Sequence, residues 1–323
     1  MQLEQKAIYN LLKADYLQNK NESIPHWKIE DYRKKELSSL FNTLASLKIS
    51  LNHQSFLAYA EEVHSPEELT ECLVLENTDT ETEDHIFLIL FELWRRLVPE
   101  KRPLSIFCDE LDEQICLYDQ ETHKQEELLQ LSLSTILSIL EENVDAGEDP
   151  LLLFKMLQTH SIHDLEAFLY DFIAEKLDQE QYAYASELID GFYPFVIDKD
   201  WFNLLQARLF LSTNPSKTNS IIKELIQKEP IDLELYLETL QFLSHCADEQ
   251  LFLTLAKKTI PFLESEDQLQ DLLLSTMQYY CCLDKEKEEN AIQQLLKKRE
   301  HILSDNPVDD NILAQVMILI GKN

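Results

Sequence analysis

Glycine is scarce in this sequence, and its scarcity excludes several classes of site. Only Gly147, Gly191 and Gly321 occur in 323 residues, whereas a typical globular chain contains about 7% glycine. Tight βα turns, β-hairpins and phosphate-binding loops use glycine because they need positive φ or a close approach of the backbone. Three isolated glycines cannot build a Walker loop, a dinucleotide-binding turn or a Gly-x-Ser-x-Gly elbow. Because the abundant Leu, Glu, Gln, Lys and Ala are strong helix formers, we predict an all-α protein.

Basic residues are also few, which limits the partners. The chain has 28 Lys and Arg against 60 Asp and Glu, a formal net charge of −32. A field of this sign repels nucleic acid and anionic lipid headgroups, so we expect neither as a partner. We expect instead another protein or a peptide that presents a basic or amphipathic segment. The 45% of hydrophobic residues is enough to build packed cores.

Long hydrophobic runs are missing as well. The most apolar stretch, 86–91, ends at Glu92, whereas a membrane-spanning helix needs about 20 apolar residues. Residues 1–6 lack the basic start and apolar run of a secretory signal. The sequence therefore predicts no membrane insertion and a cytoplasmic location.

Paired cysteine motifs do not occur. The cysteines are scattered without a CxxC spacing, at Cys72, Cys108, Cys116, Cys246, Cys281 and Cys282. This pattern favours neither a disulfide framework nor a structural zinc site. We expect buried free thiols, and no metal or other cofactor.

The N-terminal half shows helical periodicity without a repeat. The spacing of apolar residues predicts helices over 2–17, 27–50, 53–63, 85–98, 105–119 and 124–142. Ser65 and Pro66 predict the start of another helix, because Ser accepts a hydrogen bond from a backbone N–H group and Pro fits the first turn. The polar, acidic segment 76–84 is predicted to be an exposed loop.

Residues 145–150, which include Gly147, are the expected hinge between two domains. Residues 1–145 would form an N-terminal helical bundle, and 150–323 a second helical domain.

A 34-residue recurrence characterises the second domain. Asp164, Asp198 and Asp232 stand 34 residues apart, and an aromatic residue follows each after four positions: Phe168, Phe202 and Tyr236. Such a period is typical of stacked helix pairs, since one pair cannot bury its apolar face alone. The predicted pairs are 164–177 with 181–193, 198–211 with 216–228, 232–245 with 248–263, and 267–282 with 286–302, followed by a last helix from 309.

This half resembles the tetratricopeptide repeat family. Pro230 closes one unit, and the apolar Leu188, Ile222 and Ala256 occupy the position of the second helix that packs inward in the family. The positions that hold small residues in the family carry larger ones here: Phe172, Gln206, Leu240, Tyr184, Thr218 and Phe252. The resemblance implies a divergent tetratricopeptide-like α-α superhelix in this half. With the helices predicted for the first half, the expected fold is an N-terminal helical bundle followed by that superhelix. A generic helical bundle with a coincidental period is the alternative.

The family commonly binds an extended peptide or a helix in a concave groove. In members that grip C-terminal carboxylates, Lys, Arg and Asn line the groove, and here Asn203 and Arg208 fall on the first helix of the second unit. Trp201 stands where neighbouring units have Ala167 and Leu235. We therefore name Trp201, Asn203 and Arg208 as candidate partner-binding residues. The other units do not repeat the basic positions, so we expect no carboxylate-gripping groove.

The resemblance and the lack of catalytic motifs indicate a non-enzymatic interaction scaffold or a chaperone-like adaptor. The alternative is a helical metal-binding protein or enzyme that uses His160 and His163 with nearby carboxylates. A third hypothesis is a structural subunit or homo-oligomer that associates through an apolar C-terminal helix, whose residues are Ile312, Leu313, Val316, Met317, Leu319 and Ile320.

A basic island stands out in the acidic N-terminal half. Arg95, Arg96, Lys101 and Arg102 follow Trp94. These side chains could receive an acidic segment of a partner, or they could pair internally with acids such as those of 76–84 or 109–113.

Overall fold

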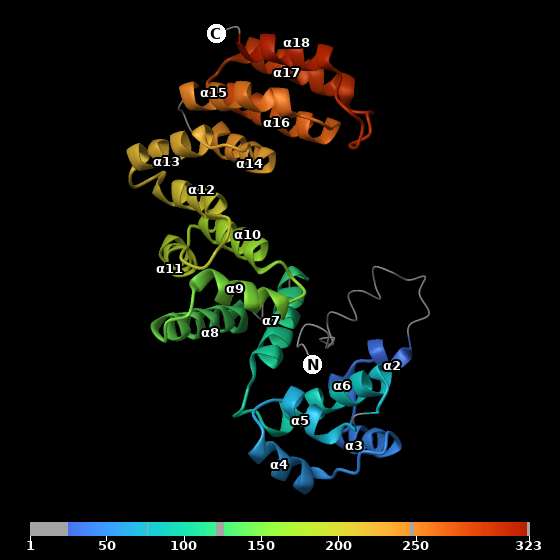
Figure 1. The fold of residues 1–323 in the computed structure, drawn as a ribbon. Coiled ribbons are helices and arrows are strands. Elements are labelled where there is room, and N and C mark those ends of the chain that lie inside the picture. Colours follow the sequence, from blue (N-terminus) through green and yellow to red (C-terminus); the bar gives the residue numbers. More distant parts are fainter. Residues whose placement is uncertain (1–24, 76, 121–125, 246–248, 322–323) are drawn as a thin grey trace. The chain divides into compact units, whose positions relative to one another are not determined.

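The fold is all-α, as the composition predicts. The computed structural model describes residues 25–75, 77–120, 126–245 and 249–321, and these contain 17 α-helices, two 3-10 helices and no strand (Figure 1). The one isolated β-bridge within those ranges joins Ser265 and Pro307. The helices fall into two compact units, of which the first ends at Phe168 and the second begins at Leu169.

Unit 1 is built around helix α6 (Thr80–Leu97). The other elements are α2 (His26–Ile29), η2 (Tyr32–Lys34), α3 (Leu37–Ser46), α4 (His53–Glu62), α5 (Pro66–Leu73), α7 (Leu104–Asp119), α8 (Glu126–Asp145) and α9 (Pro150–Thr159). Every residue from 86 to 94 in α6 is buried. A helix that is apolar all round must be covered on all sides, and α3, α5 and η2 pack against it.

Two predictions in unit 1 are wrong. Residues 27–50 do not form one helix, because they divide into α2, the 3-10 helix η2 and α3. Arg96 donates to the backbone carbonyls of Tyr32 and Arg33 in η2, at 2.8 Å each, and these tertiary bonds replace bonds of a continuous α-helix. The loop predicted over 76–84 ends at Asp79, and residues from Thr80 on belong to α6. The Asp79 side chain caps this helix by accepting a 2.9 Å hydrogen bond from the Thr82 amide.

The predicted start at Ser65 is confirmed. Its side chain accepts a hydrogen bond from the Glu68 amide, and Pro66 occupies the first turn of α5. The expected hinge also lies between two helices, where Gly147 has a φ of +103°. The boundary between the units nevertheless lies further on, within α10 (Leu165–Asp178), because α9 packs against α8.

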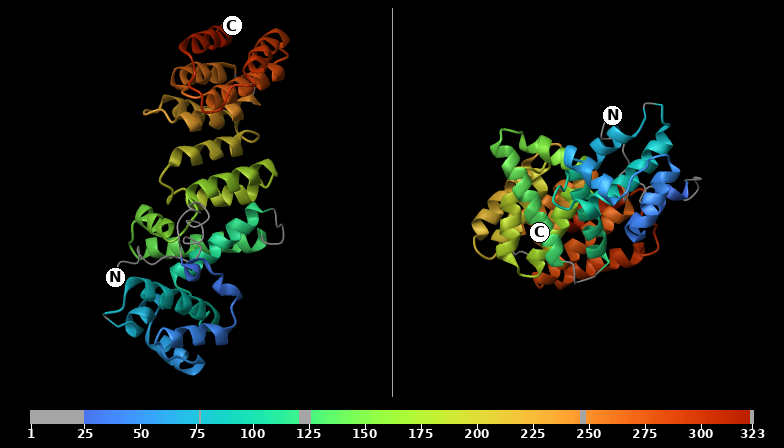
Figure 2. Two further views of the ribbon diagram at one scale, coloured as in Figure 1. Left: turned by 90° about the vertical axis from the view of Figure 1, so that its right-hand side faces the viewer. Right: turned by 90° about the horizontal axis from the view of Figure 1, so that it is seen from below.

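Unit 2 consists of successive helix pairs. After α10 come α11 (Tyr182–Phe192), α12 (Lys199–Phe210), α13 (Pro215–Gln227), α14 (Leu233–Ser244), α15 (Glu249–Thr259), η4 (Ile260–Phe262), α16 (Glu266–Cys282), α17 (Glu286–Arg299) and α18 (Asp310–Gly321). Each lies within a few residues of its predicted position. Packed pairs are α12 with α13, α14 with α15, and α16 with α17, and the helices follow one another in chain order from yellow-green to red (Figures 1 and 2).

The recurring aspartates share one role. Asp164 accepts from the amides of Glu166 and Ala167 at 3.0 and 3.2 Å. Asp198 caps α12 and Asp232 caps α14 in the same way, with their carboxylates 3.1 Å from backbone nitrogens. A side-chain cap satisfies N–H groups that have no partner inside the helix. The recurrence therefore marks the starts of α10, α12 and α14.

Helix α18 covers the end of this core with much of its apolar surface. Val316 and Ile320 are fully buried, while Ile318 is 57% exposed. The helix packs against α15, η4 and α17. The apolar residues expected to support a homo-oligomer are thus used in part inside the unit. In the described ranges, no helix is both long and apolar enough to cross a membrane.

A buried ion pair joins α16 to α17. Arg299 Nε donates to Glu266 Oε1 at 2.8 Å, and Gln270 Nε2 donates to the same oxygen at 3.1 Å. Burial raises the pKa of Glu266, but these hydrogen bonds and the charge of Arg299 lower it by more, so that the pKa lies below its ordinary value of 4.5.

We expect Glu266→Gln to lower the free energy of unfolding by about 3 kcal/mol near neutral pH, because it leaves a buried guanidinium without its counter-charge. A group whose pKa is lowered by folding stabilises above its unfolded-state pKa and loses that effect as pH falls through the folded-state pKa. The difference in the free energy of unfolding between wild type and Glu266→Gln should therefore become smaller below pH 4.5. Urea denaturation at several pH values measures it, with the exposed Glu264→Gln as control. An equal loss in both variants would contradict the assignment.

Candidate functional site

Trp201 lies on the first helix of a pair and contacts the first helices on both sides. Its Nε1 donates to Asp232 Oδ2 at 3.2 Å, at the start of α14. Its ring meets the edge of Tyr170, on α10, with centroids 4.9 Å apart and planes at 80°. Edge-to-face pairs of this kind stabilise beyond their buried area. Trp201 therefore joins α10, α12 and α14.

Arg208 lies on the same face of α12, two turns later. Its Nη2 donates to Asp178 Oδ1 at 2.7 Å, and its Nη1 lies 3.9 Å from Glu238 Oε1. Tyr170 Oη donates to that same Glu238 oxygen at 3.3 Å. Burial and the charge of Glu238 raise the pKa of Tyr170 well above its ordinary range, so its hydroxyl stays protonated and able to donate.

The structure brings Trp201 and Arg208 together through Tyr170 and Glu238, but it does not bring Asn203 to them. At about 100° per residue, Asn203 points away from Trp201 on α12. Its Oδ1 accepts from Tyr193 Oη at 3.1 Å, and its Nδ2 donates to Asp200 Oδ1 at 3.4 Å. Asn203 thus belongs to the contact between α12 and the end of the preceding pair.

The sequence analysis missed Tyr170 and Glu238. They stand 68 residues apart, which is two periods of the recurrence, and so they occupy equivalent positions of α10 and α14. That spacing was a usable signal, although the intervening equivalent, Leu204, is apolar and fully buried. We call Tyr170, Asp178, Trp201, Arg208 and Glu238 the α10–α12–α14 face.

This face is suited to electrostatic recognition. The Asp178 side chain is 73% exposed and that of Glu238 is 33% exposed, whereas Arg208 is 16% exposed. The accessible charge is therefore mainly negative, and the Trp201 ring lies against Tyr170, whose hydroxyl bonds Glu238. Carboxylates next to an aromatic surface favour a cationic segment with apolar side chains.

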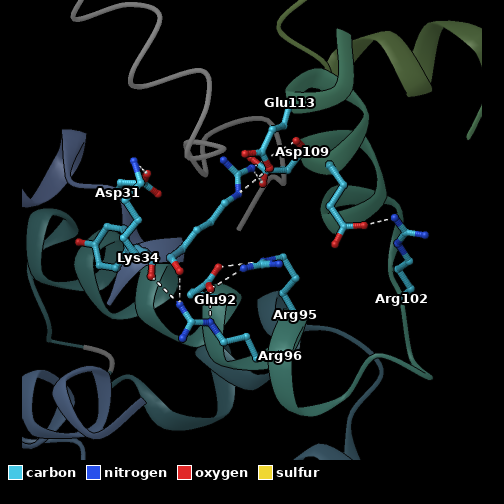
Figure 3. Close-up of polar contacts among 11 residues, drawn as sticks. Asp31, Lys34, Glu92, Arg95, Arg96, Arg102, Asp109 and Glu113 are labelled. Carbon is cyan, nitrogen blue, oxygen red and sulfur yellow. Dashed lines mark hydrogen bonds and ion pairs between the residues drawn. The ribbon is translucent and has the colours of Figure 1, made fainter. Parts of the chain in front are cut away.

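The basic island is bound internally. Arg95 donates to Glu92 through Nε and Nη2, at 2.9 and 2.6 Å, and Arg96 bonds the same carboxylate (Figure 3). The Glu92 side chain is only 4% exposed. Arg96 also donates to the carbonyl of Lys35 at 2.7 Å. One buried carboxylate thus neutralises two arginines and ties α6 to the segment around η2.

The other two cations of the island also have internal acceptors. Lys101 Nζ donates to the carbonyls of Ala60 and Val63, at 2.7 and 3.1 Å, at the end of α4. Arg102 pairs with Glu110 on α7 (Figure 3). Internal pairing with 109–113 is confirmed for Arg102, while the acids of 76–84 bind none of these four in the contacts described. The island is therefore a structural network.

His160 and His163 have separate surroundings. His160 ends α9, and burial lowers the pKa of its imidazole, an effect that the charge of Glu67 partly opposes. His163 Nδ1 lies 2.9 Å from Oδ1 of the buried Asp112. In the part of the chain that the structure describes, no group of three or more His, Cys, Asp and Glu side chains is arranged to hold a metal ion.

The cysteines are less buried than expected. Cys72, Cys116, Cys281 and Cys282 are exposed and Cys108 is buried, all as free thiols. Cys246 lies outside the described residues. The prediction of buried thiols is thus wrong for four positions, because helical periodicity does not place a lone small residue on a given face.

We expect Glu92→Gln to lower the free energy of unfolding of unit 1 by about 3 kcal/mol, since two guanidinium groups lose a buried counter-charge. The matched Glu110→Gln change breaks a more exposed pair and should cost about 1 kcal/mol or less. In a Trp201→Phe background, fluorescence reports Trp27 and Trp94 alone, so denaturation followed by fluorescence monitors unit 1. Equal effects of the two changes would show that Glu92 has no special role.

Comparisons with protein-family models, with curated proteins and with solved structures find no match to this chain.

Proposed function

We propose that this chain is a non-enzymatic interaction protein, a scaffold or chaperone-like adaptor of the cytoplasm that binds a segment of another protein. In this proposal residues 1–145 form an N-terminal helical bundle, and residues 150–323 form a divergent tetratricopeptide-like superhelix. The α10–α12–α14 face is the binding surface. The protein works without a cofactor.

The recurrence at equivalent helix positions is the observation that carries the proposal. Asp164, Asp198 and Asp232 cap α10, α12 and α14, and the aromatic residues Phe202 and Tyr236 of two of these helices are buried. In the following helices of the pairs, Leu188, Ile222 and Ala256 are buried as well. A structural role that repeats with the sequence period supports a repeat over a coincidence.

A hydrogen bond between two paired helices supports the same proposal. Thr218, on α13, donates to the carbonyl of Ala207, on α12, at 2.9 Å, and Ala207 is fully buried. A small residue at such a point lets two helix backbones lie near each other. Ala207 stands one position after Gln206, which occupies a position where the family holds a small residue.

The charge of the binding face specifies the class of partner. The chain carries a net charge of −32, and the exposed carboxylate of Asp178 and the half-buried carboxylate of Glu238 lie at Arg208. A basic or amphipathic helix or peptide complements this surface: its cations would compete with Arg208 for the carboxylates, and its apolar side chains would contact the indole. Association by such a surface is weakened by salt.

We expect Asp178→Lys to reduce partner capture by at least about fivefold, because it places a positive charge where a partner cation would bind. Asp190→Lys is the matched control, since it makes the same charge change at an exposed position of α11. Full-length wild type and both variants would be immobilised and exposed to extract of the source cells at two salt concentrations. Bound proteins would then be quantified by mass spectrometry.

The proposal expects a defined set of basic proteins that binds wild type and the Asp190 variant, and that is lost with Asp178→Lys and at high salt. Equal capture by both variants would place binding elsewhere on the chain. A catalytic turnover that required His160 or His163 would support the enzyme alternative instead.

A further inference from the structure

Among the exposed cysteines of the described ranges, Cys116 is the one whose sulfur is shown in contact with a histidine side chain. Its Sγ lies 3.7 Å from Nε2 of His163, within the range of a hydrogen bond to sulfur. The thiol is exposed, and the imidazole is 24% exposed. The pair therefore lies where a small molecule in solution can reach the sulfur.

Asp112 orients the imidazole. Its Oδ1 lies 2.9 Å from His163 Nδ1, and its Oδ2 accepts from the Ile162 amide at 3.0 Å. The Asp112 side chain is fully buried, so these bonds fix it in one geometry. A carboxylate at Nδ1 favours the tautomer that carries its proton there, and this leaves Nε2 as an acceptor that faces the thiol.

The three side chains form a chain of contacts in which Cys116 is the nucleophile, His163 the base and Asp112 the carboxylate that orients the base. Asp112 and Cys116 stand one turn apart on α7, and His163 comes from the segment between α9 and α10. Transfer of the thiol proton to Nε2 produces a thiolate beside an imidazolium, and Asp112 stabilises the imidazolium. The thiolate is the reactive form of cysteine.

The surrounding charge otherwise opposes a thiolate. Cys116 lies in the last turns of α7, near the negative end of the helix dipole. On the same helix are the acids Asp112, Glu113 and Asp119, and the first turn of the packed helix α8 has Glu126 and Glu127. Of the described groups named here, His163 is the one that can carry a positive charge, and we expect the reactivity to depend on it.

We propose that Cys116 is a redox modification site whose thiol, activated by His163, reacts with hydroperoxides. The Sγ thiolate attacks the terminal oxygen of R–O–O–H, so that an S–O bond forms and the O–O bond breaks. Sulfur is oxidised by two electrons, and the peroxide oxygens are reduced. The departing alkoxide takes the proton from His163 Nε2, which yields a sulfenic acid and an alcohol.

The chain contains its own reference thiols. Cys72, Cys281 and Cys282 are also exposed, and in the contacts described no histidine lies against Cys72 as His163 does against Cys116. Burial raises the pKa of Cys108 to about 12, so that thiol stays protonated and unreactive. The rate of oxidation rises with the thiolate fraction and with exposure. The exposed Cys72, Cys281 and Cys282 control for exposure, and the buried Cys108 shows the effect of burial.

The test measures the rate at each cysteine of the full-length protein. Purified, reduced protein would be treated with hydrogen peroxide and a sulfenic-acid trap, or separately with iodoacetamide, and modification would be followed by peptide mass spectrometry. An ordinary cysteine is only a few per cent thiolate near pH 7. After allowance for the weaker nucleophilicity of a more acidic thiol, we expect Cys116 to react about tenfold faster than Cys72.

His163→Gln should remove this advantage, and the matched His160→Gln change should leave it intact. Protection of the buried Cys108 in the same molecules shows whether the fold is preserved. In wild type, the rate at Cys116 is compared directly with the rates at the other exposed cysteines. This comparison needs no variant, so it decides the question even if His163→Gln fails to fold. Equal rates at Cys116 and Cys72, or an advantage that survives in His163→Gln, would overturn the proposal.

Discussion

Basic side chains join helix ends and neighbouring helices throughout this acidic chain, and the packing in each unit depends on them. Arg96 bonds the segment around η2 to α6, and Lys101 satisfies carbonyls at the end of α4. In unit 2, Lys258 Nζ donates to the carbonyl of Ile226 at 2.6 Å, and Arg299 pairs with the buried Glu266. Carbonyls at the end of a helix have no partner within it. Cations that reach from another element satisfy these groups.

This internal use of cations determines the character of the surface. With 28 basic against 60 acidic residues, contacts such as those of Arg95, Arg96 and Lys101 leave a large surplus of carboxylates. Many of these stay solvated, as Asp178 does at 73% exposure. The acidic exterior and the internal pairing of the basic island therefore both follow from the same composition, and the proposed cationic partner rests on them.

Buried carboxylates also position groups with potential chemistry. Glu92 neutralises two arginines and has a structural role. Asp112 is as deeply buried but bonds an imidazole that reaches a solvent-exposed thiol. The two carboxylates differ in the second group that their partner contacts. Arg96, which bonds Glu92, also donates to backbone carbonyl oxygens, whereas His163, which bonds Asp112, lies against the Cys116 sulfur.

Local interactions were sufficient to determine much of the fold from the sequence. The all-α class and most helix positions follow from apolar spacing and from the lack of glycine. The caps at Ser65, Asp198 and Asp232 could be read from residues at most a few positions away, since a capping bond spans two or three residues. The 34-residue recurrence likewise located the starts of α10, α12 and α14.

Only the tertiary structure decided which side chains meet. Arg96 and Tyr32 are 64 residues apart, Trp201 and Asp232 are 31 apart, and Cys116 and His163 are 47 apart. Periodicity tells which face of a helix is apolar, but not which helix will cover it or at what rotation. The break in 27–50, the α10–α12–α14 face and the Cys116–His163–Asp112 arrangement all depend on such pairings, and these are set by packing between distant segments.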